Sequence, residues 1–151
     1  MRKKLITRMT GIAALCALLM NPLTTATANA APVRPATHLG TFLLRGDVMA
    51  LGDYITSADG NFRLEMQTDG NLVEYNTAAG GIACWASNTN GRDAFYAFYQ
   101  RDGNFVVYTG SGDPLWASNT VGDSGSTVNI STALLDYGSL YVGQTRIHTY
   151  C

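Results

Sequence analysis

The sequence predicts an all-β protein built from three similar antiparallel sheets. Three observations support this fold class: a glycine-rich composition with little charge, apolar and polar residues that alternate along short segments, and an internal repeat. Of the 151 residues, 46% are hydrophobic, 14% are charged and 16 are glycine. Globular domains usually carry about a quarter charged residues, and exposed helices need many of them. The composition therefore favours a turn-rich β protein over a helical bundle.

The first 30 residues have the layout of a secretory signal peptide. Four positive charges lie within residues 1–8, and an unbroken apolar run follows at 12–20. Ala28 and Ala30 supply the small residues that precede a cleavage site. The apolar run is too short for a membrane span, which needs about 20 residues. We therefore expect secretion and a mature chain that begins at Ala31 and has no transmembrane segment.

Removal of this leader changes the charge balance. The leader holds four of the ten basic residues and none of the 11 acidic ones, so the mature chain carries 6 − 11 = −5 and contains no lysine. Binding to nucleic acid or to an anionic membrane surface depends on a basic patch. We therefore expect no nucleic-acid partner.

Two cysteines, Cys84 and Cys151, remain once the leader with its own cysteine is removed. In an oxidising compartment two thiols most simply form one intrachain disulfide. Two free thiols, or a bridge between chains through Cys151, are the alternatives. These cysteines and the scattered His38 and His148 do not form a zinc motif, and we expect neither a metal nor a cofactor.

An internal repeat determines the expected architecture. The segment 66–75, MQTDGNLVEY, recurs at 99–108 as YQRDGNFVVY, and the pentapeptide WASNT follows each copy, at 85–89 and 116–120. Residues 31–38 hold two prolines and no apolar pattern, so we interpret them as a linker before one domain at 39–151.

A third, degraded copy, LLDYGSLYVG, occupies 134–143 when its central glycine is aligned with those of the other two. In this alignment Leu134, Leu140 and Val142 continue the apolar set that we expect to be buried. Glu74 interrupts that set in the first copy, and we expect it at the end of a sheet. The third copy has lost the polar set entirely.

Alternating residues predict strands, and Asp-Gly or Asn-Gly pairs predict hairpin turns at 59–60, 69–70, 90–91 and 102–103. A sheet with one apolar face cannot bury that face alone. We therefore expect about twelve strands in three sheets facing a common axis, with Trp85 and Trp116 filling the centre. A β-sandwich or barrel is the alternative from the pattern alone.

Each intact copy carries five side chains spaced by two, which a strand would place on one face. Asp, Asn, Gln and Tyr supply hydrogen-bond donors and acceptors, and Val supplies an apolar patch. This combination fits the hydroxyls and C–H groups of a sugar ring. The candidate site residues are Gln67, Asp69, Asn71, Val73 and Tyr75 in one copy and Gln100, Asp102, Asn104, Val106 and Tyr108 in the other.

No Ser–His–Asp or Cys–His grouping can be assembled from this sequence, so we expect no catalytic residues. Asp69 and Asp102 belong to separate repeats, which argues against the carboxylate pair of a glycosidase.

The motif Gln-x-Asp-x-Asn-x-Val-x-Tyr, intact twice and followed each time by Trp-Ala-Ser-Asn-Thr, resembles the bulb-type mannose-binding lectins. The similarity covers roughly residues 39–142. It implies the β-prism II fold, with three antiparallel four-stranded subdomains related by pseudo-threefold symmetry. It also implies that the Gln bonds the 3-hydroxyl of mannose, the Asp and Asn the axial 2-hydroxyl, and the Tyr the 4-hydroxyl, while the Val touches ring carbons.

The expected function is therefore that of a secreted protein that binds mannose or mannose-containing glycans through two sites. A lectin-like antibacterial toxin and a family member acting through protein contacts are the alternatives. The resemblance leaves homodimer formation open.

Overall fold

The structure is a computed structural model that describes residues 34–151, and the expected leader at 1–30 lies outside this range. The described residues form β-strands joined by turns and contain no helix. The strands are β1 (Phe42–Leu44), β2 (Val48–Ala50), β3 (Tyr54–Thr56), β4 (Phe62–Met66), β5 (Leu72–Asn76), β6 (Ile82–Ala86), β7 (Ala94–Tyr99), β8 (Phe105–Thr109), β9 (Pro114–Ala117), β10 (Thr127–Ile130), β11 (Leu140–Val142) and β12 (Thr145–His148).

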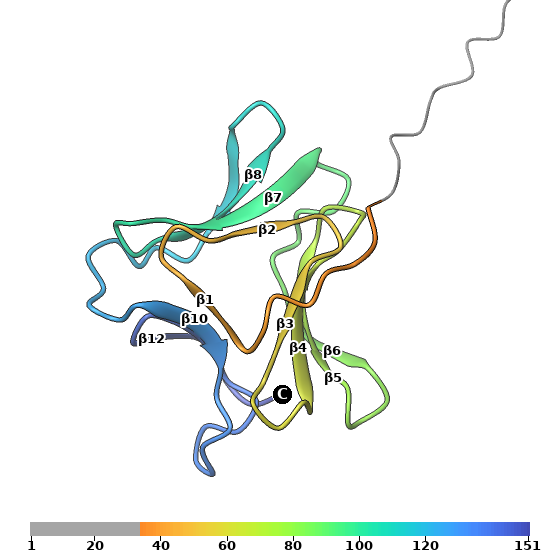
Figure 1. Cartoon of the computed structure of the whole chain (residues 1–151), viewed down its shortest axis with the longest axis vertical. Helices are drawn as coiled ribbons and strands as arrows, with labels where there is room; N and C mark the ends of the chain where they lie inside the picture. The colour runs from red at the N-terminus through yellow and green to blue at the C-terminus, as the bar shows by residue number, and fades with distance from the viewer. Residues whose placement is uncertain (1–33) are drawn as a thin grey trace, which may run out of the picture. The chain divides into compact units, whose positions relative to one another are not determined.

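These strands form three four-stranded antiparallel sheets. The first sheet has the order β3-β4-β5-β6, the second β2-β7-β8-β9 and the third β1-β10-β11-β12. The first three strands thus separate, each forming one edge of a different sheet, and the chain then completes the sheets one after another (Figure 1). The predicted all-β fold with twelve strands in three sheets is confirmed.

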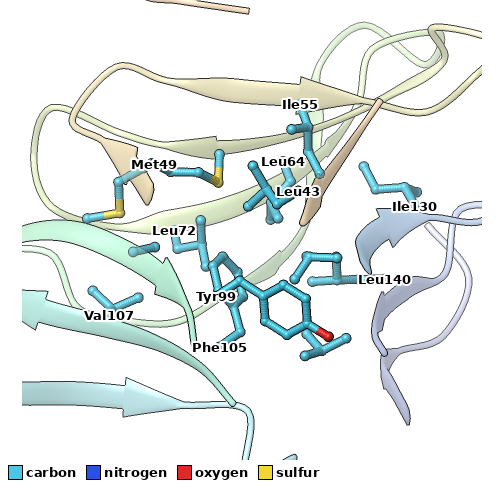
Figure 2. Packing of buried hydrophobic residues seen from close by; sticks show 14 of the residues in the cluster. Leu43, Met49, Ile55, Leu64, Leu72, Tyr99, Phe105, Val107, Ile130 and Leu140 are labelled. Atoms are coloured by element: carbon cyan, nitrogen blue, oxygen red, sulfur yellow. The ribbon is translucent and has the colours of Figure 1, made fainter. Parts of the chain in front are cut away.

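The apolar faces of the three sheets meet in one core (Figure 2). The edge strands contribute Leu43, Met49 and Ile55, each at most 1% exposed. Each sheet alone could not bury its apolar face, so the three depend on one another for stability.

The tryptophans do not fill the centre of this core, and that expectation is corrected. Trp85 and Trp116 are only partly buried and pack against the core, with their rings edge to face at 5.2 Å between centroids. The fully buried aromatic side chains are Phe62, Tyr99 and Phe105. Indole is too large to be enclosed completely where three narrow sheets converge.

Glu74 does not lie at the end of a sheet, as expected from its charge, but in the middle of β5. It pairs with Leu64 on one side and Trp85 on the other, and it is 0% exposed. Strand alternation forces its side chain onto the same face as Leu72. Neither carboxylate oxygen has a hydrogen-bond partner within the described residues. Burial raises the pKa of Glu74 to about 8.

The alignment of the third copy is correct after its glycine and wrong before it. Leu140 and Val142 are fully buried, whereas Leu134 is 93% exposed. Ile130 pairs with Leu140 as Met66 pairs with Leu72, so Ile130 occupies the position expected for Leu134. The physical reason is turn length: nine residues, 131–139, join β10 to β11, whereas five, 67–71, join β4 to β5.

Three of the four predicted turns close hairpins, at 59–60, 69–70 and 102–103. The fourth, at 90–91, instead joins β6 of the first sheet to β7 of the second. An Asp-Gly or Asn-Gly pair reverses the chain locally, but packing in the core determines which strand the next strand pairs with.

Residues 34–38, within the expected linker, run beside β3. His38 forms a parallel bridge with Tyr54 and stacks its ring on that of Tyr54, with centroids 5.0 Å apart. Arg34 forms an ion pair with Asp53, a carboxylate that is nearly buried.

Candidate functional site

The ten candidate residues form two matching groups, one on the first sheet and one on the second. Gln67, Asp69 and Asn71 lie in the turn between β4 and β5, and Val73 and Tyr75 follow on β5. The second group has the same arrangement over the turn between β7 and β8. The residues spaced by two therefore follow a hairpin rather than one straight strand.

The asparagine of each group is held by the WASNT segment that follows it in the sequence. Oδ1 of Asn71 accepts hydrogen bonds from Oγ of Ser87 at 3.1 Å and from the backbone N of Thr89 at 3.2 Å. These two bonds occupy Oδ1 and fix the orientation of the amide. Nδ2 of Asn71 makes no hydrogen bond within residues 34–151, so it remains available as a donor.

The second group repeats this arrangement atom for atom. Oδ1 of Asn104 accepts from Oγ of Ser118 at 3.1 Å and from the backbone N of Thr120 at 3.3 Å. The sequence motif alone did not identify these serines and threonines as part of the site. The signal was present, because WASNT recurs unchanged after both copies.

The aspartate of each group binds its own turn with one oxygen. Oδ1 of Asp69 accepts from the backbone N of Asn71 at 2.9 Å, and Oδ1 of Asp102 accepts from that of Asn104 at 3.0 Å. Both aspartates are exposed, so Oδ2 of each is free to accept a hydrogen bond from a ligand. The turn also requires Gly70, whose φ is +88° and whose added Cβ would lie 2.9 Å from that of Ala94.

The glutamine and tyrosine of each group are hydrogen-bonded to each other although eight residues separate them. Nε2 of Gln67 lies 2.6 Å from Oη of Tyr75, and Nε2 of Gln100 lies 2.7 Å from Oη of Tyr108. This bond leaves the amide Oε1 as an acceptor and the phenol hydrogen as a donor.

The valines form the base of each group. Val73 lies between the buried Leu72 and Glu74 in sequence, so its side chain points to the outer face of the sheet. Val73 and Val106 are nevertheless only 3% exposed. Each group therefore combines an apolar base with fixed polar groups above it.

The third sheet carries no such group. Ser139 takes the position of Asn71 but is fully buried, and its Oγ accepts from the backbone N of Tyr150. The longer turn is attached to the first sheet instead: Oη of Tyr137 donates to Oδ2 of Asp59 at 2.7 Å. Hydrogen bonds from Ser57 and Tyr137 lower the pKa of Asp59 to about 2.

The intrachain disulfide between Cys84 and Cys151 is present, as expected from the two cysteines. It ties the C-terminal residue to β6 of the first sheet, immediately before Trp85. Gly138 lies close to both, since a Cβ added there would lie 2.7 Å from the ring of Phe62 and 3.0 Å from Cβ of Cys151.

Within 34–151 no three His, Cys, Asp or Glu side chains gather where they could hold a metal ion. No helix in that range is long and apolar enough to cross a membrane. A hollow of about 370 Å³ lies against β10 and contains none of the ten candidate residues.

No family model matches this sequence. Among curated proteins, the B-type lectin plumieribetin from Scorpaena plumieri is 39% identical over 79 residues, which are 52% of this chain and 66% of that protein. The chain thus spans just under two thirds of the length of that relative.

Solved structures extend the similarity over more of the chain. The mannose-specific agglutinin from snowdrop (Galanthus nivalis) bulbs, solved with methyl-α-D-mannoside, is 34% identical, with 67% of this chain and 88% of that chain covered and a TM-score of 0.52. A monomeric monocot mannose-binding lectin from Gastrodia elata is also 34% identical, with 71% and 93% covered and a TM-score of 0.52. The three-sheet arrangement is the β-prism II fold of these bulb lectins. With this fold, and with this identity over nearly the whole length of both lectins, the chain belongs to the bulb-type lectin family.

Proposed function

We propose that this protein is a secreted lectin that binds mannose or mannose-containing glycans through two sites, one on the first sheet and one on the second. The observation that carries the proposal is the pair of identical side-chain groups. In both groups, hydrogen bonds within the protein orient the aspartate and the asparagine, and the same atoms, Oδ2 and Nδ2, remain free to bind a ligand. Residues 1–30 act as the export signal, 31–38 as a linker and 39–151 as the lectin domain.

The aspartate and asparagine provide recognition of one hydroxyl. A hydroxyl both donates and accepts, so it can donate to the free Oδ2 of Asp69 and accept from the free Nδ2 of Asn71. Both groups are fixed before the ligand arrives, which lowers the entropy cost of binding. An axial 2-hydroxyl directed into this pair distinguishes mannose from glucose, in which that hydroxyl is equatorial.

The remaining residues orient the ring. Gln67 accepts from the 3-hydroxyl and Tyr75 meets the 4-hydroxyl, while ring carbons lie over Val73. The same roles fall to Gln100, Tyr108 and Val106 in the second site. One open surface of this kind buries few atoms of a monosaccharide, so each site binds with a dissociation constant on the order of a millimolar, or about −4 kcal/mol.

The similarity to two solved lectins supports this proposal. The snowdrop agglutinin is described as mannose-specific and the Gastrodia lectin as mannose-binding. Lectins bind carbohydrates without catalysing a reaction on them, so membership of the family agrees with the expectation that this chain is not an enzyme.

Calorimetry with methyl α-mannoside and the mature protein tests the proposal. Two sites per chain are expected, and methyl α-glucoside, which differs at the 2-hydroxyl, should bind far more weakly. Three sites, no binding, or equal affinity for the two sugars would show that the assignment of the motif is wrong.

A further inference from the structure

The two proposed sites differ in the residue that flanks the valine at their base. On the first sheet, the neighbour of Val73 across the β4–β5 ladder is Glu65. On the second sheet, the neighbour of Val106 across the β7–β8 ladder is Phe98. Directly paired residues of an antiparallel ladder share a face, so both neighbours lie on the outer face with the site.

The flank of the first site is charged and its side chains are engaged with one another. Arg63 and Glu65 form an ion pair at 3.0 Å. The guanidinium of Arg63 also lies over the ring of Tyr54, 3.8 Å from its centroid. The ladder neighbour of Val73 is thus a carboxylate engaged with a cation, and not an apolar side chain.

The flank of the second site is apolar and aromatic. Tyr96, which pairs with Tyr108, stacks on it with ring centroids 5.4 Å apart. Phe98 is partly exposed, and Val48, its partner on the edge strand, is 47% exposed. The two outer rows across this sheet contain no charged residue: Val48, Phe98, Val106 and Ala117 in one, and Ala50, Tyr96, Tyr108 and Pro114 in the other.

We propose that Phe98, with Tyr96 and Val48, forms an apolar subsite that makes the second site prefer mannose carrying a substituent with an apolar face, such as the C–H face of a second hexose. This inference rests on the proposed function, because it needs a mannose ring held at Val106. With the 2-, 3- and 4-hydroxyls held there, a substituent can leave the ring only through C1 or C6. The first site lacks this preference because Glu65 occupies the position of Phe98.

Single-site variants separate the two preferences. Asn104→Ala leaves only the first site and Asn71→Ala leaves only the second. Calorimetry on each would compare methyl α-mannoside with two probes, phenyl α-mannoside and methyl 6-O-benzyl-α-mannoside, which add an apolar ring at C1 and C6. At the second site at least one probe should bind about fivefold tighter than methyl α-mannoside, the gain from burying roughly 40 Å² of apolar surface. At the first site both probes should bind like the parent.

Exchange of the flanking residues provides the direct test. In the Asn71→Ala background, Phe98→Glu should bring the ratio of probe to parent affinity to about one, and a general loss of binding would cancel in that ratio. Phe42→Glu, which changes an exposed phenylalanine on the edge strand of the third sheet, is the control and should keep the fivefold ratio. In the Asn104→Ala background, Glu65→Phe should raise the ratio.

Each outcome has one meaning. Methyl α-mannoside bound at two sites, with no probe preference at the second site or the same preference at both, overturns the subsite and leaves the proposed function standing. A ratio that survives Phe98→Glu also overturns it. Failure of methyl α-mannoside to bind at all overturns both.

Discussion

The hydroxyl of Ser87 donates a hydrogen bond to Oδ1 of Asn71 across 3.1 Å, although 16 residues separate the two in the sequence. The same hydroxyl oxygen accepts from the backbone N of Leu72 at 3.0 Å. Ser118 makes the corresponding bonds to Asn104 and to the backbone N of Phe105. In each group, one serine hydroxyl thus binds the backbone at the end of the β-hairpin and also orients the asparagine amide of the proposed site.

Ser87→Ala should therefore affect both stability and binding. It leaves a buried backbone donor without a partner, which should lower the free energy of unfolding by about 1–3 kcal/mol. It also frees the amide of Asn71, so affinity at the first site should fall while the second site is unchanged. Denaturant unfolding and calorimetry with methyl α-mannoside measure the two effects. Unchanged affinity at the first site would mean that Ser87 has no positioning role.

Removal of the asparagines should change the number of sites. Asn71→Ala or Asn104→Ala should each cost roughly 1–3 kcal/mol at the altered site, which leaves one measurable site per chain. Avidity for a branched mannose glycan should fall by far more than half, because simultaneous engagement is lost. The double variant should bind nothing and keep its fold.

Ser139→Ala is the control for these variants. Ser139 occupies the position of Asn71 on the third sheet, but it is buried, and within residues 34–151 its hydroxyl accepts one hydrogen bond, from the backbone N of Tyr150. The change should leave two sites with unaltered affinity. A lost site would assign a binding role to the third sheet and contradict the expected valence.

The stability of the protein should fall as pH rises because of Glu74. Burial raises the pKa of Glu74 to about 8, above its ordinary value of 4.5. Between about pH 5 and 8 the folded protein retains a proton that the unfolded chain has lost, so the free energy of unfolding should decrease by about 1.4 kcal/mol per pH unit from this group. This contribution is complete below pH 4.5 and is lost by about pH 8.

Two variants isolate this effect in urea titrations at several pH values. Glu74→Val introduces the residue found at the matching position 107, and it should raise the free energy of unfolding at pH 8 and remove the slope. Glu74→Gln should also remove the slope while keeping the side-chain volume. An unchanged slope in both variants would show that another group titrates.

The disulfide should contribute strongly to stability. It closes a loop of 67 residues, which the chain-entropy relation values at about 4 kcal/mol. Cys151→Ser should lower the free energy of unfolding by an amount of this order, while the two sugar sites remain. Mass spectrometry of the secreted protein without reductant should find the peptides of Cys84 and Cys151 joined. Free thiols or a covalent dimer would contradict an intrachain bond.

The proposed signal peptide predicts the first residue of the secreted protein. If residues 1–30 are removed by signal peptidase, N-terminal sequencing of the protein from the medium should begin at Ala31. Protein that keeps residues 1–30 inside the cell would contradict secretion.

The sequence by itself determined the features that repeat. Alternating residues predicted the strands and most of their buried positions, because these follow from a local period of two, and the three related segments predicted three sheets. The turn at Gly70, with φ +88°, was also predictable, since Asp-Gly marks such a turn. The ten candidate residues were recognisable because two copies retained them together.

Only the tertiary structure decided features that depend on contacts between distant residues. It placed Glu74 in the middle of a sheet, because the ladder to Leu64 and Trp85 continues through that position on the buried face. It placed Ile130, and not Leu134, at the buried position opposite Leu140, because turn length cannot be derived from an alignment on one glycine. It also joined Ser87 to Asn71 and set Phe98 beside Val106, since strand register brings together side chains whose separation in the sequence carries no signal of contact.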